Sequence, residues 1–154
     1  MFATIMCATD GSAEADRALA CAAHLASGCG SSLRVVHVAR RPAGPGWRVV
    51  VYDEEALLTK LREQTVALRG RGLDAALHVI RGGGGALAEA IAVTARAVAA
   101  DLVIVGTGGG AAAAGAALGL STALISLAPC PVLAVPAGGE SRARRRERST
   151  STAH

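Results

Sequence analysis

The sequence predicts an α/β fold, a doubly wound five-stranded parallel sheet with helices on both faces. Five strand-sized apolar runs alternate with four segments of helical periodicity, in the order βαβαβαβαβ, and this alternation is typical of a parallel sheet. The last two runs are apolar along their length, as expected of strands covered on both sides. With 154 residues, 51% of them hydrophobic and 2% aromatic, the chain predicts one domain with a core of Ala, Val, Leu and Ile.

The first half of the chain supplies two strands and a helix. Residues 2–9 form the first strand, and Asp10-Gly11-Ser12 follows as a turn in which Ser12 is a typical N-cap. The helix runs to about Ser27, because apolar residues recur at helical spacing and glycines follow them. Residues 32–38 form the second strand, where His37 alternates with core positions, which favours a packed histidine over a ligand.

The middle of the chain supplies two helices around a third strand. Residues 39–51 are an irregular connection to a helix that begins near Asp53, whose leucines form an apolar stripe while charged residues, Glu54 and Lys60 among them, face out. Residues 73–80 form the third strand, and a run of four glycines leads from it into a helix over residues 86–100.

Residues 101–136 carry the features that indicate a function. Four large apolar residues form the fourth strand, and a loop with Gly106, Gly108 and Gly109 ends it. A short helix follows, with Ser121 and Thr122 near its start, and prolines end it before a last strand at residues 132–135. Backbone N–H groups before a helix N-terminus favour an anion, so the loop predicts a phosphate site.

A membrane span and a loop that binds nothing are the alternatives for this stretch. It has no charged residue between Leu102 and Gly139, but glycines and prolines cut it into pieces shorter than the roughly 20 residues of a span. We therefore expect no membrane association. The loop without a ligand stays open, because glycines serve tight turns as readily as phosphates.

Two loops are expected to meet at the carboxyl edge of the sheet. Ligands of doubly wound sheets bind there, at the point where the strand order reverses. If the first and fourth strands are central neighbours, this switch point lies between Asp10 and Gly106. The loops Thr9-Asp10-Gly11-Ser12 and 106–110 then converge, which predicts a ligand site more strongly than either loop alone.

The last residues, 137–154, differ in composition from the domain at residues 1–136. They hold five arginines and two glutamates, which accounts for +3 of the net charge of +4. Without large apolar residues this basic tail is expected to be disordered. A solvated end is favoured over a nucleic-acid arm or a phosphorylated regulatory tail, so no nucleic-acid partner is expected.

The cysteines and the N-terminus indicate a reducing compartment. Cys7, Cys21, Cys29 and Cys130 include no CxxC pair, so no zinc site or thioredoxin-type motif is indicated, and buried free thiols are expected. The first residues lack the basic segment of a signal peptide. Both features predict a cytoplasmic protein.

The glycine loop matches neither of two common nucleotide motifs. A P-loop requires a lysine after its glycines, and the dinucleotide fingerprint requires an acidic residue at the end of the next strand. Neither is present here. The glycine pattern instead resembles the G-x2-G-x9-G-[S/T] signature of the universal stress protein family. Here the three glycines are Gly106, Gly109 and, after nine further residues, Gly119. Four further strings are similar to that family in the same order: TDGS at 9–12, LRVVHV at 33–38, DLVIVG at 101–106 and APCPV at 128–132.

The resemblance implies a Rossmann-like fold of the adenine-nucleotide alpha-hydrolase type, and a homodimer through the last strand, residues 132–135. It further implies a stress-response protein that binds ATP or AMP, with or without Mg²⁺. Asp10 would lie at the adenosine, Val38 against the adenine, and backbone N–H groups would hold the phosphates. The implied nucleotide-binding residues are Thr9, Asp10, Val38, Gly106, Gly108, Gly109, Gly119, Leu120, Ser121 and Thr122.

The sequence departs from the family signature at the phosphate end. Leu120 follows Gly119 where Ser or Thr is usual, although Ser121 and Thr122 come next, and alanines at 111–114 occupy positions that are often basic. Charge-assisted hydrogen bonds are roughly twice as strong as neutral ones, so weak affinity for a triphosphate is expected.

Three functions are therefore compared. The first is a nucleotide-binding stress-response protein, and the second is a dimeric interaction or scaffold protein of the same fold that binds no nucleotide, which Leu120 favours. The third is an enzyme such as a nucleotide hydrolase. Asp10 is the only carboxylate predicted at the cleft, and His24, His37 and His78 fall within regular elements. The sequence therefore predicts no catalytic residue and no metal ligand. At most, weak ATP hydrolysis is expected.

Overall fold

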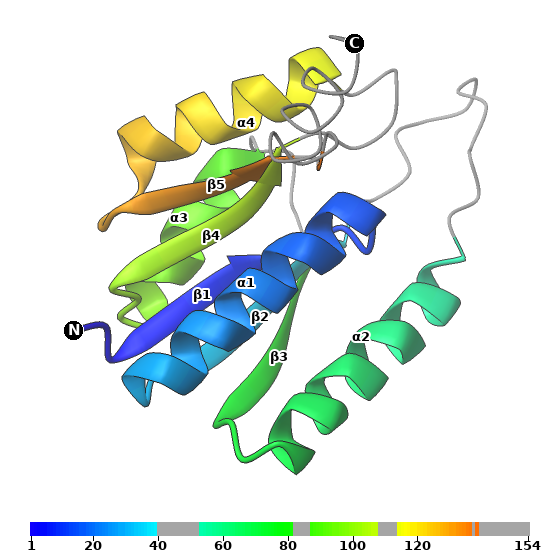
Figure 1. The fold of residues 1–154 in the computed structure, drawn as a ribbon. Coiled ribbons are helices and arrows are strands. Elements are labelled where there is room, and N and C mark those ends of the chain that lie inside the picture. The colour runs from blue at the N-terminus through cyan, green and yellow to red at the C-terminus, as the bar shows by residue number, and fades with distance from the viewer. Residues whose placement is uncertain (40–52, 82–86, 108–113, 137, 139–154) are drawn as a thin grey trace, which may run out of the picture.

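Strands and helices alternate along the whole described chain (Figure 1). The computed structural model describes residues 1–39, 53–81, 87–107, 114–136 and 138. The elements within these ranges are β1 (Thr4–Ala8), α1 (Ala13–Cys29), β2 (Ser32–Ala39), α2 (Glu54–Gly70), β3 (Ala75–Arg81), α3 (Leu87–Ala97), β4 (Leu102–Thr107), α4 (Ala114–Leu127) and β5 (Val132–Pro136).

The five strands form one parallel sheet in the order β3-β2-β1-β4-β5. Figure 1 shows α1 and α2 on one face of this sheet and α3 and α4 on the other. The predicted doubly wound α/β fold is confirmed. Strand β1 is central and pairs with both β2 and β4, since Ile5 is in register with Leu33 on one side and Leu102 on the other. The chain order reverses at β1, so the switch point lies between β1 and β4.

Each face of the sheet has its own apolar core, because successive side chains of a strand point to opposite faces. Under α1 and α2 the core is built by Ile5, Cys7, Leu33, Val35 and the alanines of α1. Under α3 and α4 it is built by Met6, Val36, Val103, Val105, Ile91 and Leu124. The contiguous apolar run of β4 thus serves both cores, as the sequence predicts.

Helix α1 begins and ends with the predicted capping residues. The Ser12 side-chain oxygen accepts a hydrogen bond from the Ala15 N–H at 3.2 Å. Gly30 adopts the left-handed conformation with φ 67° and donates its N–H to the Ala26 carbonyl. The predicted end near Ser27 is two residues short of the observed end at Cys29.

Helix α4 begins much earlier than predicted. It starts at Ala114 and has 14 residues, so Ser121 and Thr122 lie seven and eight residues beyond its first residue. The prediction of a short helix starting near these two residues is wrong. Its early part is rich in alanine, the best helix former, and this outweighs the cost of Gly115 and Gly119.

Several predicted features lie outside the described residues. They are the irregular connection from residue 40 onward, the four-glycine turn at 82–85, the loop with Gly108 and Gly109, and the basic tail apart from Gly138. Among the helices described, none is both long enough and apolar enough to cross a lipid bilayer.

Asp101 ties the start of β4 to the N-terminal segment. One carboxylate oxygen accepts the Thr4 N–H at 2.9 Å and the Ala3 N–H at 2.7 Å. These two bonds hold the pKa of the Asp101 carboxyl below its usual 3.8. Because the folded pKa is lowered, the carboxylate contributes stability that is complete above the unfolded pKa and is lost as pH falls through the folded one.

We expect Asp101→Asn to be less stable than the wild type near neutral pH, by an amount that shrinks as the pH falls below about 4. The amide keeps the shape of the side chain but accepts N–H groups without a charge. Urea unfolding at neutral pH and at about pH 3 measures this. A difference in stability that is the same at both pH values would contradict the assignment.

Candidate functional site

The loop between β1 and α1 is a tight turn fixed by its own side chains. Thr9 is buried and its hydroxyl accepts the Gly11 N–H at 3.1 Å, while the Asp10 carboxylate accepts the Ser12 N–H at 2.9 Å. Gly11 has φ 77°, which favours glycine. Asp10 is exposed at the carboxyl end of β1, where the sequence analysis expected it.

Helix α2 holds this loop from the outside. The Lys60 ammonium donates to the Gly11 carbonyl at 2.9 Å and pairs with the Asp16 carboxylate at 2.7 Å. A side chain on Gly11 would collide with Leu57. Leu57 and Lys60 lie three residues apart on one face of α2 and both contact the loop. The prediction that Lys60 faces out misses these contacts, although the side chain is 40% exposed.

His37 lies at the same edge and joins three elements. It is 5% exposed, its Nδ1 lies 3.1 Å from the Thr9 carbonyl oxygen, and its Nε2 lies 2.9 Å from a carboxylate oxygen of Glu54. The expectation of a packed histidine is confirmed. His37 lies within β2, as expected, but near the carboxyl end of that strand. The expectation that Glu54 faces out misses this contact, although its side chain is 44% exposed, and it gives the edge a carboxylate from α2 beside Asp10.

The end of β4 meets the first turn of α1. A side chain on Gly106 would lie 2.9 Å from the carbonyl oxygen of Glu14 and 3.3 Å from the nitrogen of Ala15, so only glycine lets the two backbones approach this closely. The Thr107 hydroxyl, one residue on, donates to the Val135 carbonyl of β5 at 3.3 Å. The end of β4 and the β1–α1 turn therefore converge at the switch point, as predicted.

Val38 and Leu120 belong to the opposite face of the sheet from His37. Both are partly buried against the core under α3 and α4. Ser121 beside them is buried and Thr122 is exposed. Leu120 is thus a packing residue, which explains an apolar side chain where the family signature usually has a hydroxyl.

Gly119 lies inside α4 rather than at its N-terminus. A helix leaves its first four N–H groups without an intrahelical partner, which here are those of residues 114–117. The Gly119 N–H belongs to the next turn. The positive end of the helix dipole therefore lies at Ala114, and the structure brings Thr9, Asp10 and Gly106 together without bringing Gly119 to the helix start.

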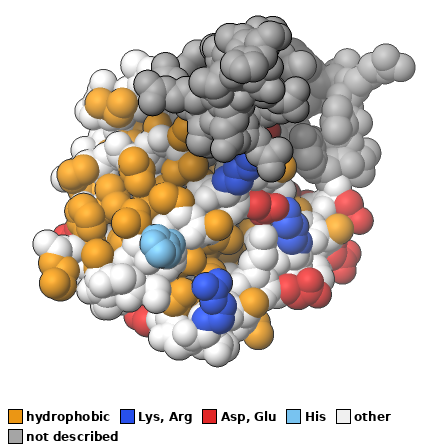
Figure 2. All heavy atoms as spheres, viewed as in Figure 1, with side chains coloured by type: hydrophobic (Ala, Val, Ile, Leu, Met, Phe, Trp, Pro, Cys, Tyr) orange, Lys and Arg blue, Asp and Glu red, His pale blue; other side chains and the backbone are white. Residues whose placement is uncertain are grey.

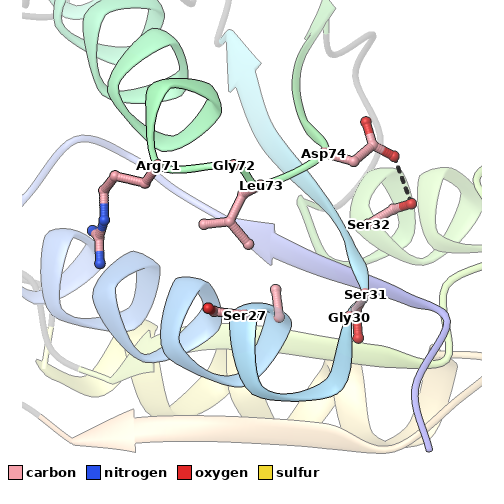
Figure 3. Close-up of a pocket in the computed structure, with 9 residues that line it drawn as sticks. Ser27, Gly30, Ser31, Ser32, Arg71, Gly72, Leu73 and Asp74 are labelled. Atoms are coloured by element: carbon pink, nitrogen blue, oxygen red, sulfur yellow. Dashed lines mark hydrogen bonds between the residues drawn. The ribbon is translucent and has the colours of Figure 1, made fainter.

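A shallow pocket of about 240 Å³ lies at the opposite, amino edge of the sheet (Figure 3). It is bordered by the C-terminal ends of α1 and α2 and by Asp74, which accepts hydrogen bonds from the Ser32 hydroxyl at 2.7 Å and from Arg34 at 3.3 Å. The Ser32 bond first, and then the charge of Arg34, hold the Asp74 pKa below its usual value. Because it lies at the other edge, this pocket is separate from the switch point.

The cysteines give no sign of chemistry. All four are free thiols, as predicted, but only Cys7 is buried, and Cys21, Cys29 and Cys130 are partly exposed. Burial raises the pKa of the Cys7 thiol to about 12, which keeps it protonated and unreactive. Across the ranges that the structure covers, no three His, Cys, Asp or Glu side chains gather closely enough to hold a metal ion.

The sequence analysis missed the contribution of α2. Leu57 and Lys60 contact the β1–α1 turn, and Glu54 contacts His37 of β2, although these residues are 17 to 49 positions away from their partners in sequence. Their spacing of three residues was the available signal, because residues three apart share a helix face. The apolar stripe that includes Leu57 was predicted, but the contacts of these three residues with the distant turn and with His37 were not.

Comparisons with known proteins give a consistent family. The model of the universal stress protein family matches residues 1–136. A search of curated proteins by sequence gave no match. A universal stress family protein from Burkholderia pseudomallei is similar in structure with a TM-score of 0.64 and 26% identity, over 88% of this chain and 96% of that one.

Two further solved structures contain nucleotides. One is a universal stress protein in complex with cAMP, with a TM-score of 0.65 and 24% identity over 87% of this chain and 97% of that one. The other is from Archaeoglobus fulgidus in complex with dAMP, with a TM-score of 0.61 and 22% identity over 88% and 98%. These likenesses show the fold, and because the family model spans residues 1–136 of 154, this chain belongs to the universal stress protein family.

Proposed function

We propose that this chain is a cytoplasmic stress-response protein that binds an adenine nucleotide, ATP or AMP, at the switch point between β1 and β4. The observation that carries the proposal is the meeting of the β1–α1 turn with the end of β4, where Gly106 contacts the first turn of α1. This edge is where doubly wound sheets bind ligands. The cAMP-bound and dAMP-bound relatives support an adenine nucleotide over other ligands.

The described side chains at this edge fit an adenosine group. Asp10 is exposed, and its carboxylate can accept hydrogen bonds from ribose hydroxyls or from the adenine amino group. Val38 is partly buried and offers apolar surface to the base. For the phosphates we propose the N–H groups at the start of α4, residues 114–117, where the helix dipole favours an anion. The contacts predicted for Gly108, Gly109 and Gly119 to Thr122 stay predictions.

Nucleotide binding is expected to raise the melting temperature of the protein. A ligand at about ten times its dissociation constant adds about 1.4 kcal/mol, which corresponds to roughly 3–6 °C for a domain of this size. Thermal melting with ATP, ADP, AMP and adenosine, each with and without Mg²⁺, measures this. Because the segment from Leu102 to Gly139 contains no Lys or Arg that could pair with the phosphates, we expect AMP to bind at least as tightly as ATP.

Asp10→Ala is the matched test of the site. It removes the exposed carboxylate but leaves the Thr9 hydroxyl that accepts the Gly11 N–H, so the turn is kept. We expect the fold to survive and the shift with AMP to be lost. The proposal fails if no nucleotide at millimolar concentration shifts the melting temperature of the wild type.

A dimeric interaction protein of the same fold is the second candidate, and it is supported by the apolar surface of α4 and β5. Strand β5 is a sheet edge, and Ile125, Leu127 and Leu133 are exposed. Figure 2 shows apolar side chains gathered toward the β5 side of one face, whereas Asp and Glu lie mainly over α2. An exposed apolar edge strand pairs readily with a second copy.

The homodimer is expected to form through β5, residues 132–135. Light scattering should give twice the mass of the chain at micromolar concentration, and Leu133→Asp should give the monomer, because it places a charge on the exposed apolar edge. Val79→Asp is the matched control, since Val79 is also exposed but lies on β3 at the far edge of the sheet. A monomer for the wild type over the whole concentration range would contradict the dimer.

A further inference from the structure

His37 is bonded to two groups that only accept hydrogen bonds. Its Nδ1 lies 3.1 Å from the carbonyl oxygen of Thr9, and its Nε2 lies 2.9 Å from a carboxylate oxygen of Glu54. Neither a carbonyl nor an ionised carboxylate can donate. Both contacts are therefore hydrogen bonds only when the ring carries a proton on each nitrogen, which makes it an imidazolium.

The imidazolium has a buried place and a charged partner. The His37 side chain is 7% exposed, and Glu54, the first residue of α2, is 44% exposed and supplies the opposite charge. Removing one proton from the ring breaks one of the two bonds. A neutral ring can keep either the Thr9 carbonyl or the Glu54 carboxylate, but not both.

The Thr9 carbonyl determines the orientation of Asp10. The carbonyl of Thr9 and the N–H of Asp10 belong to one planar peptide, so a bond that fixes the first also fixes the second. The N–H of Thr9 donates to the Val36 carbonyl of β2 at 2.8 Å, so Thr9 is still bonded to the sheet at its N–H. The next peptide, between Thr9 and Asp10, is where the chain departs from the sheet. His37 therefore controls the peptide from which the Asp10 side chain projects.

We propose that His37 is a positioning residue for nucleotide binding, and that its charged form ties the β1–α1 turn to the start of α2. The proposal rests on the proposed function, because the turn it positions is the adenosine side of that site. His37 itself does not touch the nucleotide. When the ring loses one proton, one of its two bonds is lost and either the turn or α2 is freed, so nucleotide affinity falls with the loss of that proton.

The other charges around the ring do not compete for it. On α2, Lys60 is paired with Asp16 of α1 and bonded to the Gly11 carbonyl. In the turn, the Asp10 carboxylate is bonded to the Ser12 N–H. On β3, Arg81 is in register with Ala39, two residues beyond His37, and is exposed. Glu54 is thus the charged group that contacts the ring among the residues described.

AMP affinity measured by calorimetry from about pH 5.5 to about 8.5 tests the proposal. The wild type should bind roughly tenfold more weakly at the high end, about the effect of one charge-assisted hydrogen bond. His37→Gln should bind with the low affinity throughout, apart from the titration of AMP itself, which both proteins share. His24→Gln is the matched control, because His24 is exposed on α1, and its profile should follow the wild type.

Glu54→Gln keeps the test valid if His37→Gln does not fold. Glu54 is part exposed, and its amide still accepts one hydrogen bond but no longer supplies a charge. We expect a smaller loss of affinity and a loss that begins at lower pH than in the wild type. A wild-type pH profile that coincides with that of either folded variant, His37→Gln or Glu54→Gln, overturns the proposal.

Nitrogen NMR of the imidazole rings separates failure of this proposal from failure of the proposed function. The His37 ring should carry two protons while it holds both contacts, and the Asp10 and Gly11 amide signals should shift as one proton leaves. If no nucleotide binds at any pH, the proposed function fails, yet these signals still show whether the ring holds the turn. A ring that has a single proton at every pH where the protein is folded, or amide signals that do not follow the loss of its second proton, overturns the inference.

Discussion

Gly106→Ala is expected to lower the free energy of unfolding by about 1–3 kcal/mol, the usual cost of forcing a methyl group into a filled space. The new Cβ would lie 2.9 Å from the Glu14 carbonyl oxygen and 3.1 Å from its carbonyl carbon. Both atoms belong to the backbone of α1, so no side chain can turn aside. Helix α1 would have to move away from β4, and the buried alanines of α1 would lose contact with the sheet.

Gly119→Ala is the matched control within the same sequence signature. Apart from its chain neighbours and the adjacent backbone of α4, no atom of the described residues lies within 4 Å of the position of a Cβ on Gly119, which is inside α4. Alanine in place of a helical glycine should raise the free energy of unfolding by about 0.5–1 kcal/mol. Urea unfolding of both variants should therefore give opposite signs. A destabilised Gly119→Ala would contradict the helix start at Ala114.

This pair separates two reasons for a glycine that a sequence signature treats alike. Gly106 is required by the approach of α1 to β4, whether or not a phosphate lies beside it. The glycine at this position is therefore not evidence of a ligand by itself. The evidence for a ligand site lies in the meeting of the two strand ends at the switch point, with Asp10 exposed beside them.

The fold could be predicted from the sequence because its signals are local and repeated. Apolar runs such as residues 102–105 mark strands covered on both faces, and Ser12 with the glycines near residue 30 marks the ends of α1. Right-handed crossovers between parallel strands leave few ways to order them. Apart from the start of α4, predicted strand and helix boundaries differ from the observed ones by a few residues, as frayed ends lead one to expect.

The candidate site could be predicted only in part, because its remaining contacts join residues far apart in sequence. Lys60 and Gly11 are 49 residues apart, and His37 and Glu54 are separated by a connection of irregular sequence. A polar residue at the border of an apolar stripe was assigned to solvent, as is usual for a surface helix. Only the packing of α2 against the β1–α1 turn reveals that these polar groups have partners there.

The start and orientation of helix α4 were difficult to predict for a different reason, because the helix has no charged residue to mark an outer face or an end. Residues 114–127 consist of small, apolar and hydroxyl side chains, so their pattern shows neither where the helix begins nor how it is turned. Leu124 and Ile125 illustrate the difficulty. They are neighbours of almost equal hydrophobicity, yet Leu124 is fully buried and Ile125 is 67% exposed.

Leu124→Ala is expected to lower the free energy of unfolding by about 2–5 kcal/mol, the largest effect among the substitutions considered. The side chain is fully buried in the core that α3 and α4 form with the sheet, where Ile91 and Val103 are its fellow members. Truncation leaves a cavity that the rest of α4 can fill only by moving toward β4. Thermal or urea unfolding against the wild type measures the loss.

Ile125→Ala, one residue away, removes a comparable apolar side chain from the surface and should change the free energy of unfolding by less than about 0.5 kcal/mol in a monomer. Equal losses of stability at the two positions would show that α4 is rotated about its own axis, so that Leu124 and Ile125 are equally buried. If the proposed dimer uses α4 beside β5, Ile125→Ala should instead become destabilising as protein concentration rises, because a partner that binds only the folded state stabilises it by mass action. The Leu124→Ala loss would persist at every concentration, so measuring the pair across a concentration series separates packing within one chain from pairing between two.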